Sequence, residues 1–188
     1  MGTIIFFAVL AVIVVYAVMV YNGLVNVKHA VSKAWANIDV LLKQRHDELP
    51  KLVEVCKQYK QFEQETLEKV IRARSLVQQA RERQDVGALG PAEGMLRSSL
   101  GTLFAVAEAY PELKASENFL RLQEDLTDTE DKISAARRYY NATVMRYNTA
   151  VQSFPWLLFA GPFGFRAREF FSAEGDTGVP QVSFSTAS

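Results

Sequence analysis

The spacing of hydrophobic and polar positions divides the chain into three parts. Residues 4–20 form an unbroken run of apolar or small side chains, and residues 1–21 contain no charged side chain. From about residue 24 to residue 154, apolar positions recur at alternating spacings of three and four, which is typical of helices that bury one face. After residue 154 the helical spacing is lost. The pattern predicts an apolar anchor, a helical body and an irregular end.

Residues 3–21 are predicted to cross a lipid bilayer as a single helix, since a span needs about 20 apolar residues. A buried core helix is disfavoured because no face of this run is polar. A cleaved signal peptide is disfavoured because no basic segment precedes the run and no small-residue cleavage site follows it. Lys28 and Lys33 follow the anchor and, taken alone, favour a cytoplasmic body.

No proline or glycine interrupts residues 24–49, so the anchor is expected to continue directly into the first helix of the body. Pro50 restricts the residue before it and suits an early helical position, which predicts a tight connection or a strong kink there. The expected core positions of this first helix are Val27, Val31, Ala34, Ile38, Leu41 and Arg45, widened by Leu24, Trp35 and Leu42.

Three further helices are expected. The second runs from Pro50 to about residue 83, and residues 85–91, with two glycines and a proline, read as a loop. The third covers residues 92–110, and the fourth begins after Ser116, a suitable N-cap. The expected core of the second is Leu52, Cys56, Tyr59, Glu63, Thr66, Val70, Ala73, Val77 and Ala80; that of the fourth is Phe119, Leu122, Leu126, Thr129, Ile133, Ala136, Tyr140, Thr143, Tyr147, Ala150 and Phe154.

The fold class is therefore all-α. We expect residues 1–22 to form the transmembrane anchor and residues 23–154 an elongated antiparallel four-helix bundle continuous with it. A free parallel coiled coil is disfavoured, because the breaks in the pattern invite the chain to fold back.

Residues 155–188 are expected to form an irregular aromatic arm and a tail, with a short extended element at residues 181–184. Two interpretations of the arm stay open: its aromatic side chains cover one end of the bundle, or they contact another copy, a partner or the membrane interface.

Composition narrows the possible functions. The 188 residues include 21 basic and 21 acidic side chains, and this zero net charge argues against nucleic acid as a partner. His29 and His46 lie far apart without cysteine or carboxylate ligands at metal spacing. Glu63 and Glu130 lack the accompanying histidines of di-metal bundles. We therefore expect no cofactor, no metal and no enzymatic activity, and we expect Cys56 to be a buried, inert thiol.

Arg45 is the polar residue that stands out, because it falls at a core position. Asp39, Asp47 and Glu48 are near in sequence, so a partly buried ion pair or a bond to carbonyl groups at the helix end is expected.

Two groups of motifs resemble the LemA family of bacterial membrane-anchored helical proteins. The first comprises Tyr21-Asn22-Gly23-Leu24-Val25, Ala34-Trp35, Ile38-Asp39, Leu42, Arg45 and Leu49-Pro50-Lys51-Leu52-Val53. The second comprises Tyr140-Asn141, Tyr147-Asn148-Thr149, Phe154-Pro155, Ala160-Gly161, Phe163-Gly164-Phe165, Phe170-Phe171 and Pro180-Gln181-Val182-Ser183-Phe184. The chain departs from the family at residues 56–59 and at the bulky residues 156–159.

The resemblance implies a helical bundle on an N-terminal span, no assigned enzymatic activity and a molecular role that is undefined for the family. Some relatives carry a lipoprotein cysteine in place of the span, and others belong to magnetosome membranes. This favours the bacterial inner membrane with an extracytoplasmic, periplasmic body, against the indication of the two lysines.

These features lead to the hypothesis of a non-enzymatic, membrane-anchored scaffold that self-assembles in the membrane plane to organise or shape membrane or to hold partner proteins. The alternative is a monomeric adaptor or regulatory subunit of a membrane enzyme such as a protease. The expected structural and interaction residues are Trp35, Arg45, Pro50, Tyr147, Asn148, Phe154, Pro155, Trp156, Phe159, Phe163, Phe165, Phe170 and Phe171.

Overall fold

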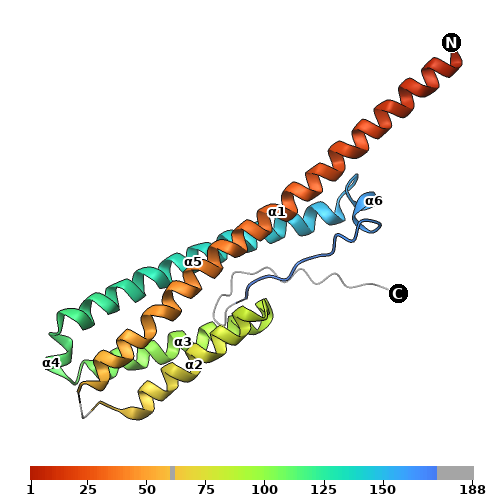
Figure 1. Cartoon of the computed structure of the whole chain (residues 1–188). Coiled ribbons are helices and arrows are strands. Elements are labelled where there is room, and N and C mark those ends of the chain that lie inside the picture. The colour runs from red at the N-terminus through yellow and green to blue at the C-terminus, as the bar shows by residue number, and fades with distance from the viewer. Residues whose placement is uncertain (60–61, 173–188) are drawn as a thin grey trace, which may run out of the picture. The chain divides into compact units, whose positions relative to one another are not determined.

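A computed structural model describes residues 1–59 and 62–172, and over these residues the protein is all-helical, as predicted (Figure 1). The helices are α1 (Gly2–Lys57), α2 (Gln64–Glu82), α3 (Val86–Ala107), α4 (Pro111–Lys114), α5 (Glu117–Gln152) and α6 (Leu157–Ala160). The N-terminal part of α1 is long and apolar enough to cross a membrane, by its length and composition.

The chain divides into two compact units. Unit 1 contains Met1–Lys43 and Thr129–Phe170, and unit 2 contains Gln44–Asp128 and, among the described residues, Phe171 and Ser172. Unit 1 therefore includes the apolar start of α1, most of α5 and the arm up to Phe170, whereas unit 2 includes α2, α3 and α4.

Helix α1 does not end at Pro50, so the predicted connection there is wrong. The proline lacks the N–H group that would bond the carbonyl oxygen of His46, four residues earlier. That oxygen instead accepts a hydrogen bond from Nε of Arg74 in α2, at 3.1 Å. The partner from another helix replaces the missing intrahelical bond, and α1 continues for two more turns before it ends at Lys57.

The second helix is consequently shorter than predicted and begins at Gln64. Leu52 and Cys56 belong to α1, and Glu63 precedes α2 with its side chain exposed. Tyr59 also lies before α2 and is half-buried. The predicted core positions within α2 are confirmed, since the following residues are all buried: Thr66, Val70, Ala73, Val77 and Ala80.

The predicted loop at residues 85–91 is also mostly helical. Gln84 adopts φ 53°, and the Asp85 N–H bonds the Ala80 carbonyl at 3.0 Å, which together close the end of α2. The Asp85 side chain then accepts a bond from the Ala88 N–H at 2.9 Å and caps α3. Only Gln84 separates Arg83, the C-cap of α2, from Asp85, the N-cap of α3, so the connection is short. Pro91 lies inside α3.

Helix α3 ends at Ala107, and Pro111 begins the short helix α4. Ser116 immediately precedes α5, and its carbonyl accepts the Leu120 N–H at 3.0 Å. Figure 1 shows α2 and α3 side by side in unit 2.

The core of unit 1 follows the spacing that was read from the sequence. Leu24, Val31, Ala34 and Ile38 of α1 are buried, and so are Ile133, Ala136, Tyr140, Thr143, Tyr147 and Ala150 of α5. The Trp35 ring is half-buried and meets the Tyr140 ring edge-on, with centroids 5.9 Å apart. Phe154 departs from the prediction: it follows the end of α5 and is 77% exposed.

The arm contains one short helix, α6, followed by a turn at Gly164 and a non-helical stretch. Gly164 has φ +70°, a conformation that glycine adopts without strain. The extended element expected at residues 181–184 lies outside the described residues.

Candidate functional site

The candidate site lies in unit 1, where the aromatic arm packs against α1 just after its apolar run. The Tyr21 ring lies 5.1 Å from that of Phe163 and 6.1 Å from that of Phe165, measured between centroids. Lys28, two turns further along α1, places its Nζ 5.6 Å from the centre of the Phe165 ring. These aromatic and cation–π contacts hold Phe163 and Phe165 of the arm against α1.

Trp156 contacts α1 at Gly23. A Cβ atom at residue 23 would lie 3.2 Å from Nε1 of Trp156, so a larger residue would require the indole to shift. With about 100° of rotation per residue, Tyr21 and Lys28 lie on one flank of α1 and Gly23 near the opposite flank. The arm therefore touches α1 on two flanks.

The arm then follows α5, where Asn148 holds it by the backbone. Asn148 Nδ2 donates to the Arg168 carbonyl at 2.9 Å, and the Arg168 N–H donates to Asn148 Oδ1 at 2.8 Å. About two helical turns before Asn148 on α5, the Tyr140 hydroxyl donates to the Glu169 carbonyl at 3.3 Å. Burial raises the pKa of both Tyr140 and Tyr147, and the nearby Arg168 acts in the opposite direction. Both phenols thus remain neutral at neutral pH, and the hydroxyl of Tyr140 acts as the donor to the arm.

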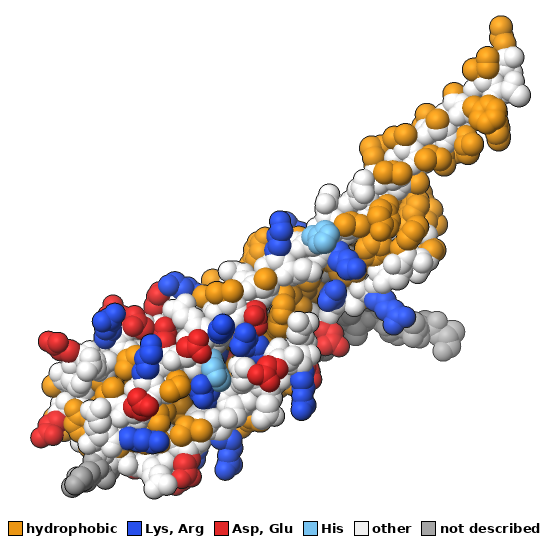
Figure 2. Space-filling view, in the orientation of Figure 1, with side chains coloured by type: hydrophobic (Ala, Val, Ile, Leu, Met, Phe, Trp, Pro, Cys, Tyr) orange, Lys and Arg blue, Asp and Glu red, His pale blue; other side chains and the backbone are white. Residues whose placement is uncertain are grey.

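The arm is partly covered and partly open. Ala160 and Phe165 are buried, and so is Phe171, whereas Phe154, Leu157, Leu158 and Phe163 are exposed. Figure 2 shows hydrophobic side chains over the start of α1 and over the neighbouring α6 region, with Lys and Arg side chains next to them. The first interpretation of the arm holds in part, because some of its side chains cover the protein, whereas contact of the exposed ones with another copy, a partner or the membrane stays a prediction.

A buried ion pair lies in unit 2. Arg45 of α1 bonds the Glu93 carboxylate of α3 through Nη2, and both side chains are almost completely buried. The pair joins α1 to α3, and neither residue lines the groove described below. The sequence predicted an ion pair for Arg45 but not Glu93, which lies 48 residues away.

His46 and Arg74, also in unit 2, form a second polar contact. Arg74 Nη2 lies 2.7 Å from His46 Nε2, so the imidazole nitrogen acts as the acceptor. Burial, followed by the charge of Arg74, lowers the pKa of His46. His46 is thus held in its neutral form at neutral pH.

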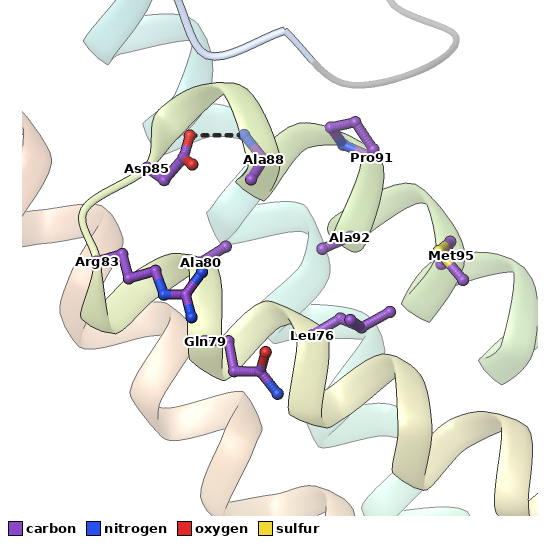
Figure 3. Close-up of a pocket in the computed structure, with 9 residues that line it drawn as sticks. All are labelled: Leu76, Gln79, Ala80, Arg83, Asp85, Ala88, Pro91, Ala92 and Met95. Atoms are coloured by element: carbon purple, nitrogen blue, oxygen red, sulfur yellow. Dashed lines mark hydrogen bonds between the residues drawn. The ribbon is translucent and has the colours of Figure 1, made fainter.

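A groove of about 370 Å³ lies between α2 and α3, with Leu76, Ala80, Ala92 and Met95 among its lining residues (Figure 3). Asp85 lies at one end, but its carboxylate is already used to cap α3 at Ala88. The residues that line the groove include no nucleophile paired with a base.

Other candidate chemistry is equally sparse. Within residues 1–59 and 62–172 no group of three or more His, Cys, Asp and Glu side chains is placed to hold a metal ion. Cys56 is buried, and burial raises its pKa to about 11, which leaves the thiol protonated and unreactive at neutral pH.

The structure brings together some of the predicted residues and separates others. Trp156, Phe159, Phe163, Phe165, Tyr147 and Asn148 gather around the arm, with Phe159 stacked on Phe163 at 6.5 Å. Trp35 lies further along α1, and Arg45 and Pro50 belong to unit 2. In the arm, Pro155 is half-buried, Phe170 is partly exposed and Phe171 is fully buried.

The sequence interpretation missed Glu93, Arg74, Lys28 and Arg168. Glu93 carried a signal, because it is an isolated acid among small and apolar residues in GPAEGML. The other three look like ordinary surface bases in the sequence.

Comparison with known proteins gives consistent matches. The sequence model of the LemA family matches residues 34–184. Protein LemA of Metamycoplasma hominis is 31% identical over 154 residues, which cover 80% of this chain and 68% of that protein. Magnetosome protein MamQ of Magnetospirillum gryphiswaldense is 34% identical over 99 residues, or 50% of this chain and 36% of that protein. Magnetosome protein MamQ 2 of Paramagnetospirillum magneticum is 34% identical over 105 residues, or 52% of this chain and 39% of that protein. The match thus spans well under half the length of the MamQ proteins.

Proposed function

Because the chain belongs to the LemA family and carries one helix that is long and apolar enough to cross a membrane, we propose that it is a non-enzymatic membrane scaffold that self-assembles in the membrane plane. Its role would be to organise or shape a membrane region, or to hold partner proteins there. The elongated antiparallel four-helix bundle expected from the sequence is part of this proposal. The names of the MamQ relatives, which are magnetosome proteins, agree with a role at a membrane.

An exposed apolar stripe on α5 carries the proposal. Ala135, Tyr139, Ala142 and Met145 follow one another at spacings of four, three and three, so they share one face of the helix. All are exposed, with Tyr139 at 62% and Met145 at 57%. Tyrosine and methionine are enriched at protein interfaces, where a flat ring and a flexible thioether adapt to a partner.

The occupant we propose for this stripe is a second copy of the chain. A membrane anchor holds all copies in one plane with one orientation, which raises their effective concentration and makes a modest apolar contact sufficient. The small side chains of Ala135 and Ala142 allow a helix of the second copy to approach closely.

The mass of the full chain, extracted in mild detergent, tests the proposal. We expect an oligomer for the unmodified protein and a monomer for Tyr139→Arg/Met145→Arg, because charge at the stripe opposes the contact. The matched control is Met95→Arg/Leu120→Arg, which changes two apolar residues of 49% exposure each outside the stripe. An unmodified chain that is monomeric, or a stripe variant with unchanged mass, would contradict self-assembly.

Crosslinking in intact membranes separates the alternative function. A ladder of self-products is expected for the scaffold. A single product with another protein would instead favour the adaptor or regulatory subunit of a membrane enzyme, and would count against the scaffold.

We further propose that the anchor lies in the bacterial inner membrane with the body on the periplasmic side, as the family resemblance implied. Lys28 and Lys33 favour the opposite side by charge alone. Protease treatment of intact spheroplasts is expected to digest the body, and a fully protected body would place it in the cytoplasm.

A further inference from the structure

Four large apolar side chains of the arm face outward within ten residues of sequence. Phe154 is 77% exposed, and Leu157, Leu158 and Phe163 are 56%, 63% and 59% exposed. We call these four residues the arm loop. We propose that the arm loop enters the interfacial layer of the bilayer beside the anchor, so that the protein holds the membrane at a second place. This inference rests on the membrane anchoring in the proposed function and does not depend on self-assembly.

The position of the arm loop within unit 1 is the first argument. Phe163 contacts Tyr21, the residue that closes the apolar run of α1, and the neighbouring Trp156 contacts Gly23. The arm loop therefore lies next to the end of the apolar run of α1. Tyr and Trp rings favour the level where hydrocarbon meets the lipid headgroups.

The distribution of charge is the second argument. In residues 22–38 and 140–170 the basic side chains are Lys28, Lys33, Arg146, Arg166 and Arg168, and the acidic one is Glu169. Lys28 lies about 10 Å beyond Tyr21 along the helix axis, at the depth of the headgroups if the anchor ends at Tyr21. Anionic headgroups attract bases at this level. An apolar loop bordered by bases thus matches an anionic lipid surface.

The same charges argue against a second copy as the occupant of the arm loop. Lys28, whose Nζ lies 5.6 Å from the centre of the Phe165 ring, and the exposed Arg166 lie close to the arm loop, so pairing two copies of this surface would bring like charges together. Like charges that face each other across an interface are unfavourable, and basic side chains of two copies would form no favourable contact with each other. The apolar stripe of α5 and the arm loop therefore suit different occupants.

A fluorescent reporter in the full chain, reconstituted in vesicles of phosphatidylglycerol and phosphatidylcholine, tests the inference. An environment-sensitive maleimide dye is attached at Leu158→Cys, and the matched control is Val40→Cys on α1. Leu158 is 63% exposed and Val40 is 64% exposed, so the two sites differ in location and not in exposure. Cys56 can stay, since its buried thiol with a pKa of about 11 reacts slowly with maleimide.

We expect spin-labelled lipids to quench the dye at residue 158 several times more strongly than at residue 40, and aqueous iodide to show the reverse order. Arg166→Gln, or vesicles of phosphatidylcholine alone, is expected to reduce the lipid quenching at residue 158. Leu157→Cys provides a second reporter in case one substitution disturbs folding.

Equal quenching at residues 158 and 40 by both agents would overturn the inference. Protection of residue 158 that disappears when the protein is diluted with excess lipid would also overturn it, because the occupant would then be a second copy. A monomeric chain whose residue 158 is quenched by lipid would instead refute self-assembly and support the arm loop, so the two proposals fail separately.

Discussion

Asn148 holds the backbone of Arg168 through both ends of its side-chain amide, with hydrogen bonds of 2.9 and 2.8 Å. This paired contact reproduces what a neighbouring strand would offer and fixes the arm along α5. We expect Asn148→Ala to release the arm, since two hydrogen bonds contribute about 1 kcal/mol each. Amide hydrogen exchange in a peptide covering residues 165–169 should become about tenfold faster or more.

The control for this change is Asn118→Ala, which removes an exposed asparagine from the same helix. Unchanged exchange in Asn148→Ala would show that the ring contacts of Phe163 and Phe165 hold the arm without the amide.

The contact between Arg74 and the His46 carbonyl predicts a thermodynamic coupling with Pro50. Arg74→Ala leaves that partly buried carbonyl without a donor, which costs about 1–3 kcal/mol. We expect the melting temperature to fall by about 3–6 °C, as measured by circular dichroism in detergent. In a Pro50→Ala background the residue 50 N–H can bond the carbonyl, so the same substitution should cost clearly less.

Equal losses of melting temperature in the two backgrounds would contradict this explanation of Pro50. Such a result would mean that Arg74 acts through other contacts, including the one to the His46 ring.

His46 predicts a loss of stability on the acid side. Its folded pKa lies below the ordinary value near 6.5, because burial disfavours the cation and Arg74 and Arg81 repel it, against the attraction of Asp47 and Glu82. The unfolded chain therefore binds more protons between the two pKa values. The contribution of His46 is present above about pH 6.5 and is lost as the pH falls towards the folded pKa.

The measurement compares melting temperatures at about pH 7.5 and about pH 5.5. His46→Gln should show a smaller difference between the two pH values than the unmodified chain. His29→Gln serves as the control because His29 is exposed. If both variants keep the full difference, His46 is not the group that titrates.

The buried pair of Arg45 and Glu93 predicts strong non-additivity. Arg45→Met leaves the Glu93 carboxylate buried without this partner, which typically costs about 3–5 kcal/mol. A fall in melting temperature of about 10 °C or more is expected for a chain of this size. Arg45→Met/Glu93→Leu removes both charges and should recover most of the loss. A double variant that melts no higher than the single one would argue that the pair contributes more than charge compensation.

Much of the fold could be predicted because helical spacing reports which face of one helix is buried. Most core positions of α5 from Phe119 to Ala150 follow from that spacing, although Leu122 is only half-buried, and so do those of α2 from Thr66 onward. The N-terminal apolar helix is equally visible, because its length and lack of charge need no tertiary information.

The errors arose where one residue's conformation depends on another helix or on a local cap. Pro50 is tolerated inside α1 because Arg74, 28 residues from His46, supplies a donor. The connection before α3 is short because Asp85 caps the helix, which the glycines and the proline of the segment concealed. The arm itself was recognised from its aromatic residues, but not the contacts with Tyr21, Lys28 and Asn148 that position it, since these depend on three-dimensional proximity.

The attachment of the arm at only one end of the apolar run has a mechanical consequence. Side chains inserted there would add area to one leaflet of the bilayer and none to the other. Many copies crowded in one patch would then create an area difference between leaflets, which a membrane relieves by bending. Measuring vesicle diameter against protein density would therefore report how strongly the arm loop couples crowding to curvature.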